Sequence, residues 1–212
     1  MRLQIISYTE QERLNPKSGQ VILAQQTEDH MVVYQAYKPE IAEYAVAHQT
    51  FGGPHFSYSR MSWIKPNFLW MMYRCGWASK ENQEAVLAIW LKKTDFEIIL
   101  DNAAYSSYQE NVYQTHEHWK EDLQKKEVRI QWDPDHDPYG NKQPRRAIQL
   151  GMKGKMLQTF GNEMVQRIEN ITEFVKQQKL FLDSNQHSHF SVPLETVYKT
   201  SNALLNQKLG IQ

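Results

Sequence analysis

Residues 60–84, RMSWIKPNFLWMMYRCGWASKENQE, are strongly apolar and yet carry regularly placed cations. This stretch holds three of the six tryptophans of the chain, and Arg60, Lys65, Arg74 and Lys80 follow one another at intervals of five to nine residues. A buried cation without a partner costs several kcal/mol, so such charges need an explanation. The stretch is therefore either a core helix with charged ends or one wall of a pocket that binds an anion.

Within this stretch, the residue pattern predicts a short strand followed by a helix. Residues 57–64 alternate loosely between polar and apolar side chains, which is typical of a half-buried strand. Pro66 favours the start of a helix and Gly76 favours its end, so we expect a helix from Pro66 to about Cys75. Lys65 would then lie just before the helix N-terminus, where backbone amides already favour an anion.

On this predicted helix, Trp70, Arg74 and Trp77 share a face at spacings of four and three residues. Such a face holds a guanidinium between two indoles, an arrangement suited to cation–π contact or to binding a planar anion. The alternative is that Arg74 pairs with a carboxylate beneath an aromatic lid. The spacing alone leaves both interpretations open.

The surrounding sequence predicts interleaved strands and helices. Ala85–Leu91 (AVLAIWL) is a near-continuous apolar run of strand length, typical of a central strand buried on both faces. Thr94 and Glu97 form a capping-box pattern, which predicts a helix to about Ala104. Further strands are expected at 21–24, 31–36, 128–132, 146–152 and 164–168, and further helices near 39–50, 116–125, 154–160 and 170–183.

These elements do not follow a strict strand–helix–strand rhythm, and some strands read as pairs joined by a short connection. We therefore expect an α+β fold, a single domain with a mixed or largely antiparallel sheet flanked by helices. The predicted boundaries are an N-terminal arm at 1–20, the domain at 21–200 and a C-terminal tail at 201–212.

Composition narrows the classes of function. The chain has 212 residues and a formal net charge of zero, so no global field draws it to nucleic acid or to a membrane surface. Its single cysteine, Cys75, excludes an internal disulfide framework. The chain has no signal-peptide pattern and no apolar run of membrane-spanning length, so a cytoplasmic protein without a membrane partner is expected. No ligand pattern for a metal occurs, and none is expected to bind.

Few residues carry a recognisable catalytic pattern. Gln83 and Glu84 directly precede the predicted central strand, where polar groups at the end of a sheet strand often act in catalysis. Arg145 and Arg146 follow a loop rich in aspartates, whose carboxylates can hold them. Alternatively, Arg146 joins Arg60, Lys65 and Arg74 around one anion pocket.

Several runs resemble the family described as domain of unknown function 4291. The resemblance covers about residues 16–200 and rests on the runs VYQAYKPEIA, FSYSRMSWIKPNFLWMMYRCGW, QEAVLAI, VRIQWDPDHDP and RRAIQLGMKG. The chain departs from the family at Cys75 and Ala78, where serine and glycine are expected. The residues in these motifs that we take as candidate ligand-binding residues are Gln35, Tyr37, Arg60, Trp63, Lys65, Arg74, Trp77 and Arg146, with Gln83 and Glu84 as the catalytic candidates.

A weaker similarity is to ADP-ribosyltransferase-like domains. In those domains a strand ends in a polar residue and is followed by a short helix and a further strand with a serine or an aromatic residue. Here the corresponding residues are Gln35 and Tyr37, the helix from Ile41, and Ser62 with Trp63. No terminal glutamate motif of that kind is identifiable, so the similarity serves as analogy.

Three functions remain open from the sequence. The first is the binding of a phosphate-bearing ligand, a nucleotide or an NAD-like cofactor, in an Arg/Lys/Trp-lined pocket, with a nucleotide-dependent transferase as the enzymatic form. The second is a module for single-stranded nucleic acid with an aromatic stacking platform, which the zero net charge does not favour. The third is a non-catalytic domain that interacts with a partner.

Overall fold

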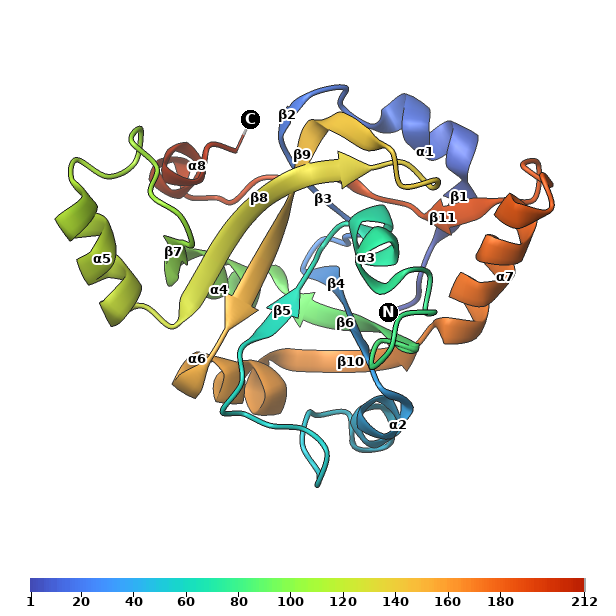
Figure 1. Cartoon of the computed structure of the whole chain (residues 1–212), viewed down its shortest axis with the longest axis horizontal. Coiled ribbons are helices and arrows are strands. Elements are labelled where there is room, and N and C mark those ends of the chain that lie inside the picture. The colour runs from blue at the N-terminus through green and yellow to red at the C-terminus, as the bar shows by residue number, and fades with distance from the viewer. Residues whose placement is uncertain (212) are drawn as a thin grey trace.

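Two β-sheets meet in the structure, a computed structural model that describes residues 1–211 (Figure 1). One sheet has three strands in the order β10-β6-β4, and the other has five, in the order β2-β9-β8-β7 with β5 also paired to β9. The strands are β1 (Ile5–Ser7), β2 (Gly19–Gln20), β3 (Ile22–Ala24), β4 (His30–Tyr37), β5 (Ser62–Ile64), β6 (Ala85–Lys92), β7 (Ala103–Tyr105), β8 (Val128–His136), β9 (Lys142–Met152), β10 (Val165–Asn170), β11 (Ser191–Pro193) and β12 (Thr196–Tyr198).

Most of the helices lie around these two sheets (Figure 1). The helices described are α1 (Tyr8–Leu14), α2 (Pro39–His48), α3 (Phe68–Cys75), α4 (Lys93–Asp101), α5 (His116–Lys125), α6 (Gly154–Thr159), a π-helical turn η1 (Phe160–Met164), α7 (Thr172–Asp183) and α8 (Ala203–Leu209). The three-stranded sheet is antiparallel, whereas the five-stranded sheet mixes parallel and antiparallel pairs. This arrangement confirms the predicted α+β class.

Strand β6 is the centre of the three-stranded sheet, as its apolar sequence predicts. Its first seven residues are all buried, and it pairs with β4 on one side and β10 on the other. Alternate residues of β6 contribute to two separate cores: Leu87 and Ile89 to one, Ala88 and Trp90 to the other. A strand buried on both faces has no polar side, which explains the continuous apolar run.

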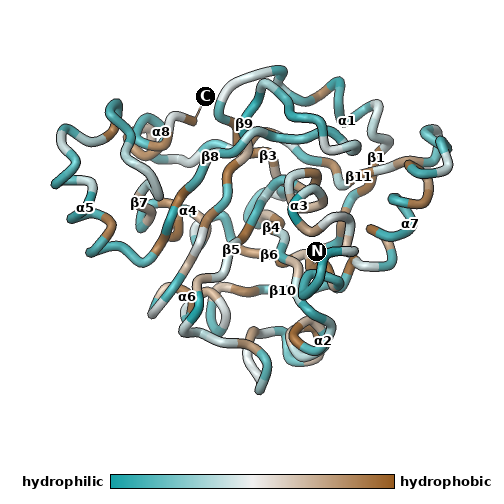
Figure 2. The backbone as a smooth tube through the Cα atoms, in the orientation of Figure 1, coloured by the Kyte–Doolittle hydropathy of each residue, from teal (hydrophilic) through white to brown (hydrophobic). Residues whose placement is uncertain are grey.

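The two cores lie on opposite faces of this sheet. The first core fills the space between the two sheets, and the second lies beneath α3 and α7. Hydrophobic residues accordingly concentrate on the central strands in Figure 2, whereas α5 is mostly hydrophilic and contains no buried residue.

The two sheets are joined directly where β4 passes the end of β5. The backbone N–H of Tyr34 donates to the carbonyl of Lys65 at 2.7 Å, and the N–H of Lys65 donates to the carbonyl of Tyr34 at 3.1 Å. Ser62, Trp63 and Ile64 precede this bridge and pair with the final residues of β9. The stretch that opens with Arg60 therefore links the two sheets before it enters α3.

Both terminal segments contain secondary structure. β1 pairs with β11, and α1 follows it directly, capped by the Ser7 hydroxyl, which accepts a hydrogen bond from the Glu10 amide. Near the other end of the chain, Leu205 and Leu209 of α8 are buried in the first core. Within residues 1–211, none of the helices has the length and apolar character needed to cross a membrane.

Some local predictions were wrong. Thr94 and Glu97 do not form a capping box, because α4 begins at Lys93 and the Glu97 carboxylate instead accepts hydrogen bonds from Tyr198 and Ser201. This helix ends at Asp101 and strand β7 follows, so the helix is shorter than predicted. A partner about a hundred residues away thus overrides a local capping signal.

The predicted elements around α3 are shorter than the sequence indicated. Only Ser62–Ile64 of the predicted strand at 57–64 pairs in a sheet. Helix α3 begins at Phe68, two residues after Pro66, because the Asn67 side chain caps it by accepting a hydrogen bond from the Trp70 amide at 2.6 Å.

An ion pair deep in the structure ties the β8–β9 hairpin to α1. The Arg145 Nε lies 2.5 Å from an Asp135 carboxylate oxygen, and both side chains are almost fully buried. Glu12 of α1 approaches the same guanidinium at 3.5 Å. The sequence-based interpretation that aspartates of this loop hold Arg145 is confirmed.

Replacing Arg145 with methionine should lower the free energy of unfolding by about 3–5 kcal/mol, because the buried Asp135 carboxylate loses its counter-charge. Arg146→Met is the matched control: Arg146 is exposed, and a change of less than about 1 kcal/mol is expected. Urea denaturation of both variants tests this. Equal effects of the two substitutions would contradict the assigned role of the buried pair.

Candidate functional site

A polar cavity of about 460 Å³ lies where the two sheets meet. Seven of the ten candidate residues from the sequence analysis are among the residues that line this cavity. They come from β4, β5, α3 and the segment that precedes β6. These seven are Gln35, Tyr37, Arg60, Trp63, Lys65, Arg74 and Gln83, and the remaining lining residues are Ala36, Met61, Ser62, Met71, Gln131 and Gln149.

Lys65 lies at the point where the two sheets are hydrogen-bonded to each other. Its backbone forms the bridge to Tyr34, and only 4% of the residue is exposed. Its ammonium group makes no hydrogen bond or ion pair with any residue in the described range 1–211. Burial, together with the positive charge of Arg74, lowers the pKa of Lys65 to about 8, and the Asp133 carboxylate only partly opposes this.

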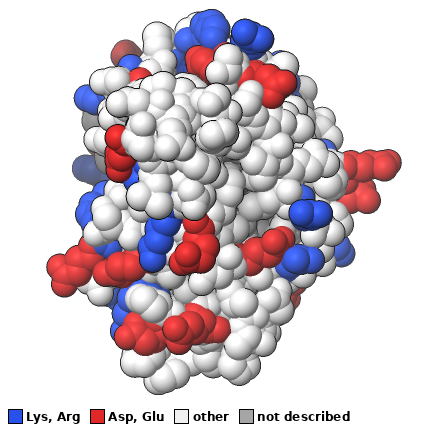
Figure 3. Space-filling model, turned by 90° about the vertical axis from the view of Figure 1, so that its right-hand side faces the viewer, with Lys and Arg blue, Asp and Glu red and all other residues white. Residues whose placement is uncertain are grey.

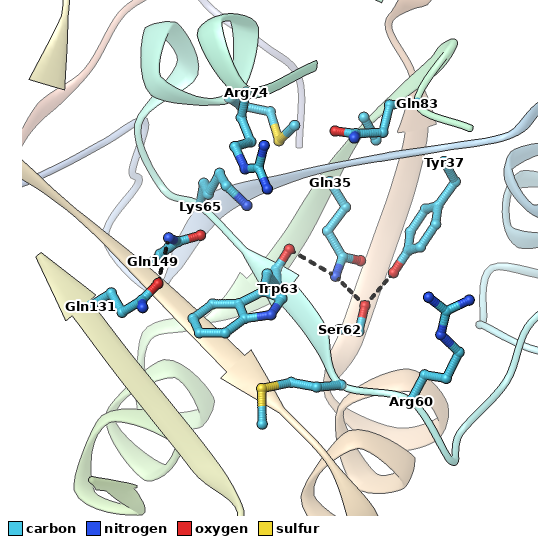
Figure 4. A pocket seen from close by; sticks show the side chains of 13 residues that line it. Gln35, Tyr37, Arg60, Ser62, Trp63, Lys65, Arg74, Gln83, Gln131 and Gln149 are labelled. Carbon is cyan, nitrogen blue, oxygen red and sulfur yellow. Dashed lines mark hydrogen bonds between the residues drawn. The ribbon is translucent and has the colours of Figure 1, made fainter. Parts of the chain in front are cut away.

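All the charged side chains that line the cavity in the described part of the chain are positive. Arg60, Lys65 and Arg74 line it, and no aspartate or glutamate is among its lining residues in the part of the chain described. None of the three cations forms a salt bridge within that range. Figure 4 shows Lys65 and Arg74 side by side, with Arg60 on the far side of Ser62. The site is thus cationic although the chain as a whole is neutral.

A hydrogen-bonded group of side chains separates Arg60 from the other two cations (Figure 4). The Gln35 amide nitrogen donates to the Ser62 hydroxyl at 2.9 Å and to the Trp63 carbonyl at 3.3 Å, and the Tyr37 hydroxyl lies 2.5 Å from the same Ser62 oxygen. The Trp63 carbonyl accepts only, so it fixes which end of the Gln35 amide is nitrogen. Gln35 Oε1 is buried without a partner.

A second polar pair comes from the β8–β9 hairpin. The Gln149 amide nitrogen donates to Gln131 Oε1 at 2.8 Å and to an Asp133 carboxylate oxygen at 2.7 Å. Because a carboxylate only accepts, this contact fixes the Gln149 amide with its nitrogen toward Asp133. Gln149 Oε1 has no protein partner within residues 1–211.

The indole of Trp63 lies over a glycine of the neighbouring strand. Gly151 pairs directly with Trp63, and a Cβ atom there would come within 2.7 Å of the indole and 2.8 Å of the Met61 sulfur. Only glycine therefore leaves room for this position of the ring. The Trp63 side chain is partly exposed and lines the cavity.

The predicted arrangement of Arg74 between two indoles is wrong. Helix α3 ends at Cys75, and Gly76, Trp77 and Ala78 adopt positive φ values, so Trp77 leaves the helix face. Trp77 is buried in the second core against Phe68 and Phe190.

Trp70 is also buried, and it stacks on the rings of Tyr73 and His136. Arg74, in contrast, is exposed at the cavity, where it faces Lys65 and not an indole.

Two further candidates lie outside the cavity lining. The exposed Arg146 lines a neighbouring cavity and donates to the Trp132 carbonyl at 2.5 Å, so it does not join the other three cations. Glu84 accepts a hydrogen bond from the Asn82 amide at 2.9 Å and does not line the cavity, whereas its neighbour Gln83 does.

Gln131 and Gln149 were not nominated by the sequence, and Ser62 was named only through the similarity to ADP-ribosyltransferase-like domains. Gln131 and Gln149 stand directly opposite each other in the β8–β9 pairing. Their only sequence signal is a polar residue within a mostly apolar strand: Gln131 alternates with apolar residues in VRIQW, as Arg129 does, and Gln149 is the lone polar side chain in AIQLGM. That signal does not indicate which two strands pair.

A second cavity of about 470 Å³ adjoins the first. The two share the four lining residues Tyr37, Arg60, Met61 and Ser62, and Lys38, Ile41 and Phe56 are among the residues that line only the second. The cationic cavity is thus continuous with a second cavity beside α2.

The model of one protein family matches residues 21–198, and its description is domain of unknown function (DUF4291). The chain belongs to this family. No curated protein matches the chain. Every lining residue of the cationic cavity falls within the matched range, and so does Arg146.

Replacing Lys65 with methionine should raise the stability of the free protein at pH 7. The folded state holds the ammonium at a pKa near 8 against an ordinary value of 10.5. This depressed pKa corresponds to an unfavourable contribution of up to about 3 kcal/mol below pH 8. Between pH 8 and 10.5 the unfolded state binds more protons, so wild-type stability rises with pH and the advantage of the variant shrinks.

Urea denaturation of Lys65→Met at pH 7 and at pH 9.5 measures this effect. The exposed Lys80 provides the matched control, and Lys80→Met should show no such dependence on pH. A Lys65→Met variant that is less stable than wild type at pH 7 would contradict the inference that the buried charge of Lys65 is only partly compensated.

Proposed function

We propose that the cavity at the junction of the sheets binds a phosphate-bearing ligand, of the nucleotide or NAD-like class. The observation that carries this proposal is the presence of three cations around one cavity whose lining contains no carboxylate. One of these cations, Lys65, is buried and forms no ion pair within residues 1–211, and the Asp133 carboxylate opposes only part of the effect of burial on its pKa. A bound anion would supply the missing charge and offset the cost of burial.

The cavity contains two arginines and a lysine, which are residue types suited to binding a phosphate group. Arginine offers a planar fork of N–H donors that matches phosphate oxygens, and lysine adds a compact point charge. Lys65 and Arg74 lie side by side, so both reach one group, whereas Arg60 lies beyond Ser62 (Figure 4). This separation suits a ligand with a second anionic or polar group, as a diphosphate has.

A transferase reaction of the ADP-ribosyltransferase-like type is the enzymatic form of this proposal. What supports it is that Gln35, Tyr37 and Ser62 correspond to the polar residues of the ADP-ribosyltransferase-like pattern. These three residues line the cavity and form one hydrogen-bonded group. Gln83 lines the same cavity, and Glu84 follows it in the chain. Analogy of fold does not by itself assign a reaction, so the experiment below measures binding.

The structure does not favour a stacking platform for single-stranded nucleic acid. Such a platform needs several exposed aromatic rings, but Trp70, Trp77, Tyr105 and Tyr113 are all buried, and Trp63 and Tyr108 are only partly exposed. On the face drawn in Figure 3, basic and acidic side chains are interspersed around large uncharged areas. That face lacks the continuous basic stripe that would follow a phosphate backbone.

Isothermal titration calorimetry with ADP, NAD and inorganic pyrophosphate tests the proposal. We expect saturable binding by the wild-type protein and a loss of about ten- to a hundredfold in affinity for Arg74→Ala, because a charge-assisted hydrogen bond is removed. Lys80→Ala, in the same segment but outside the cavity, and Glu84→Gln should bind as the wild type does. Absence of binding to all three ligands, or equal losses in Arg74→Ala and Lys80→Ala, would contradict the proposal.

The affinity should also depend on pH in a defined direction. Lys65 is cationic below its pKa of about 8 and becomes neutral above it, so affinity for the anion should fall as the pH rises through this region. The titration of the ligand itself affects the affinities of wild type and Lys65→Met equally. It therefore cancels in the ratio of the two affinities. The ratio of wild-type to variant affinity should decline between pH 7 and 10. A constant ratio would show that Lys65 does not supply the charge.

A further inference from the structure

The second cavity, beside α2, has the same kind of charge as the cationic cavity. Lys38, His55 and Arg60 are among its lining residues, and no aspartate or glutamate lines it in the described part of the chain. Neither Lys38 nor Arg60 forms a salt bridge within residues 1–211. The two adjoining cavities therefore share Arg60, and each has a further lysine of its own, Lys65 in the first and Lys38 in the second.

The ammonium group of Lys38 has hydrogen-bond donors that no protein group uses. Its Nζ lies 3.3 Å from Nδ1 of His55, and because an ammonium group only donates, the His55 nitrogen is the acceptor. His55 is therefore neutral, with its proton on Nε2. The Lys38 ammonium makes no other hydrogen bond within residues 1–211, so two of its three N–H groups are free to bind a ligand.

The boundary between the two cavities holds a hydroxyl hydrogen without an acceptor. Tyr37 and Ser62 line both cavities, and their hydroxyl oxygens lie 2.5 Å apart. One hydrogen bond between them uses only one of their two hydroxyl hydrogens. The Gln35 amide nitrogen donates to Ser62, and the Gln35 oxygen accepts no hydrogen bond. One O–H group of this pair, which lies beside Arg60 in Figure 4, can therefore donate to a ligand that crosses the boundary.

We propose that the ligand of the cationic cavity extends into the second cavity, where Lys38 and Arg60 bind a further phosphate group. This inference rests on the proposed function, because Lys65 and Arg74 hold the first phosphate group of the same ligand. The free hydroxyl at the boundary donates to the part of the ligand between the two groups. The ligand class is an extended phosphate compound, which has either a chain of at least three phosphates or two phosphates on different parts of one molecule.

Binding at both cavities strengthens the hold on such a ligand. Once Lys65 and Arg74 hold one phosphate group, the second group is presented to Lys38 at a high effective concentration. A hydrogen bond between a cationic donor and a phosphate oxygen is also among the strong ones in proteins. The second cavity measures about 470 Å³, which is within the range that small ligands occupy.

Isothermal titration calorimetry at pH 7 with pyrophosphate, tripolyphosphate, ADP and adenosine 3′,5′-bisphosphate tests the inference. ADP and the bisphosphate have the same base, sugar and number of phosphates, but only the bisphosphate carries them at separate positions. We expect tripolyphosphate to bind at least about tenfold more tightly than pyrophosphate, or the bisphosphate at least about tenfold more tightly than ADP, because a further charge-assisted contact forms. The first result assigns a linear phosphate chain, and the second assigns separate phosphate groups.

The variant Lys38→Met shows whether the second cavity provides this gain. The Lys38 side chain makes no capping hydrogen bond to α2, so its replacement leaves the helix cap unchanged. We expect Lys38→Met to lose the gain and to keep wild-type affinity for pyrophosphate, which also verifies its fold. Lys153→Met is the matched control, because the exposed Lys153 is the N-cap residue of α6, makes no capping hydrogen bond and lines neither cavity. This control should bind all four ligands as the wild type does.

The outcomes separate this inference from the proposed function. Equal affinity for the extended and the compact ligands overturns the second phosphate position, while the first phosphate site stands. A gain that persists in Lys38→Met, or that Lys153→Met loses to the same extent, overturns the role of the second cavity. Absence of binding to all four ligands overturns the proposed function and this inference with it.

Discussion

Two backbone hydrogen bonds between Tyr34 and Lys65 hold the two sheets of this protein together at the cationic cavity. They fix the direction of the chain as it leaves β5. They therefore also fix the position of α3, which begins at Phe68, after Pro66 and Asn67. Because the side chain of Lys65 starts from this bridge, it is buried by the architecture itself. The burial of this charge is thus a consequence of how the sheets are joined.

The cation at position 65 does not contribute to the stability of the protein without a ligand. A neutral side chain at position 65 would avoid the desolvation that lowers the pKa of Lys65, and the unpartnered oxygen of Gln35 adds a further cost. Groups that lower stability in this way are typical of binding sites, where a ligand supplies the missing partner. The zero net charge of the chain conceals this local concentration of positive charge.

The sequence predicted the elements better than the cavity. The apolar run of β6 and the segment around α3 were recognisable because local patterns determine them, and the family motifs brought seven lining residues to attention. Trp77 was misplaced because Gly76 ends the helix and turns the chain into the second core. Arg146 was misplaced because successive strand residues face opposite ways, so Arg145 is buried and Arg146 is exposed. Gln131 and Gln149 depend on the pairing of β8 with β9, which no local pattern encodes.

We propose that the buried Lys65 and the neighbouring Arg74 form an anion site at the junction of the sheets. Crystals soaked in tungstate, a heavy analogue of phosphate, test it most directly through an anomalous difference map. We expect a strong peak within hydrogen-bonding distance of the Lys65 ammonium and the Arg74 guanidinium. Peaks only at the outer surface, with the cavity free of tungstate, would contradict it.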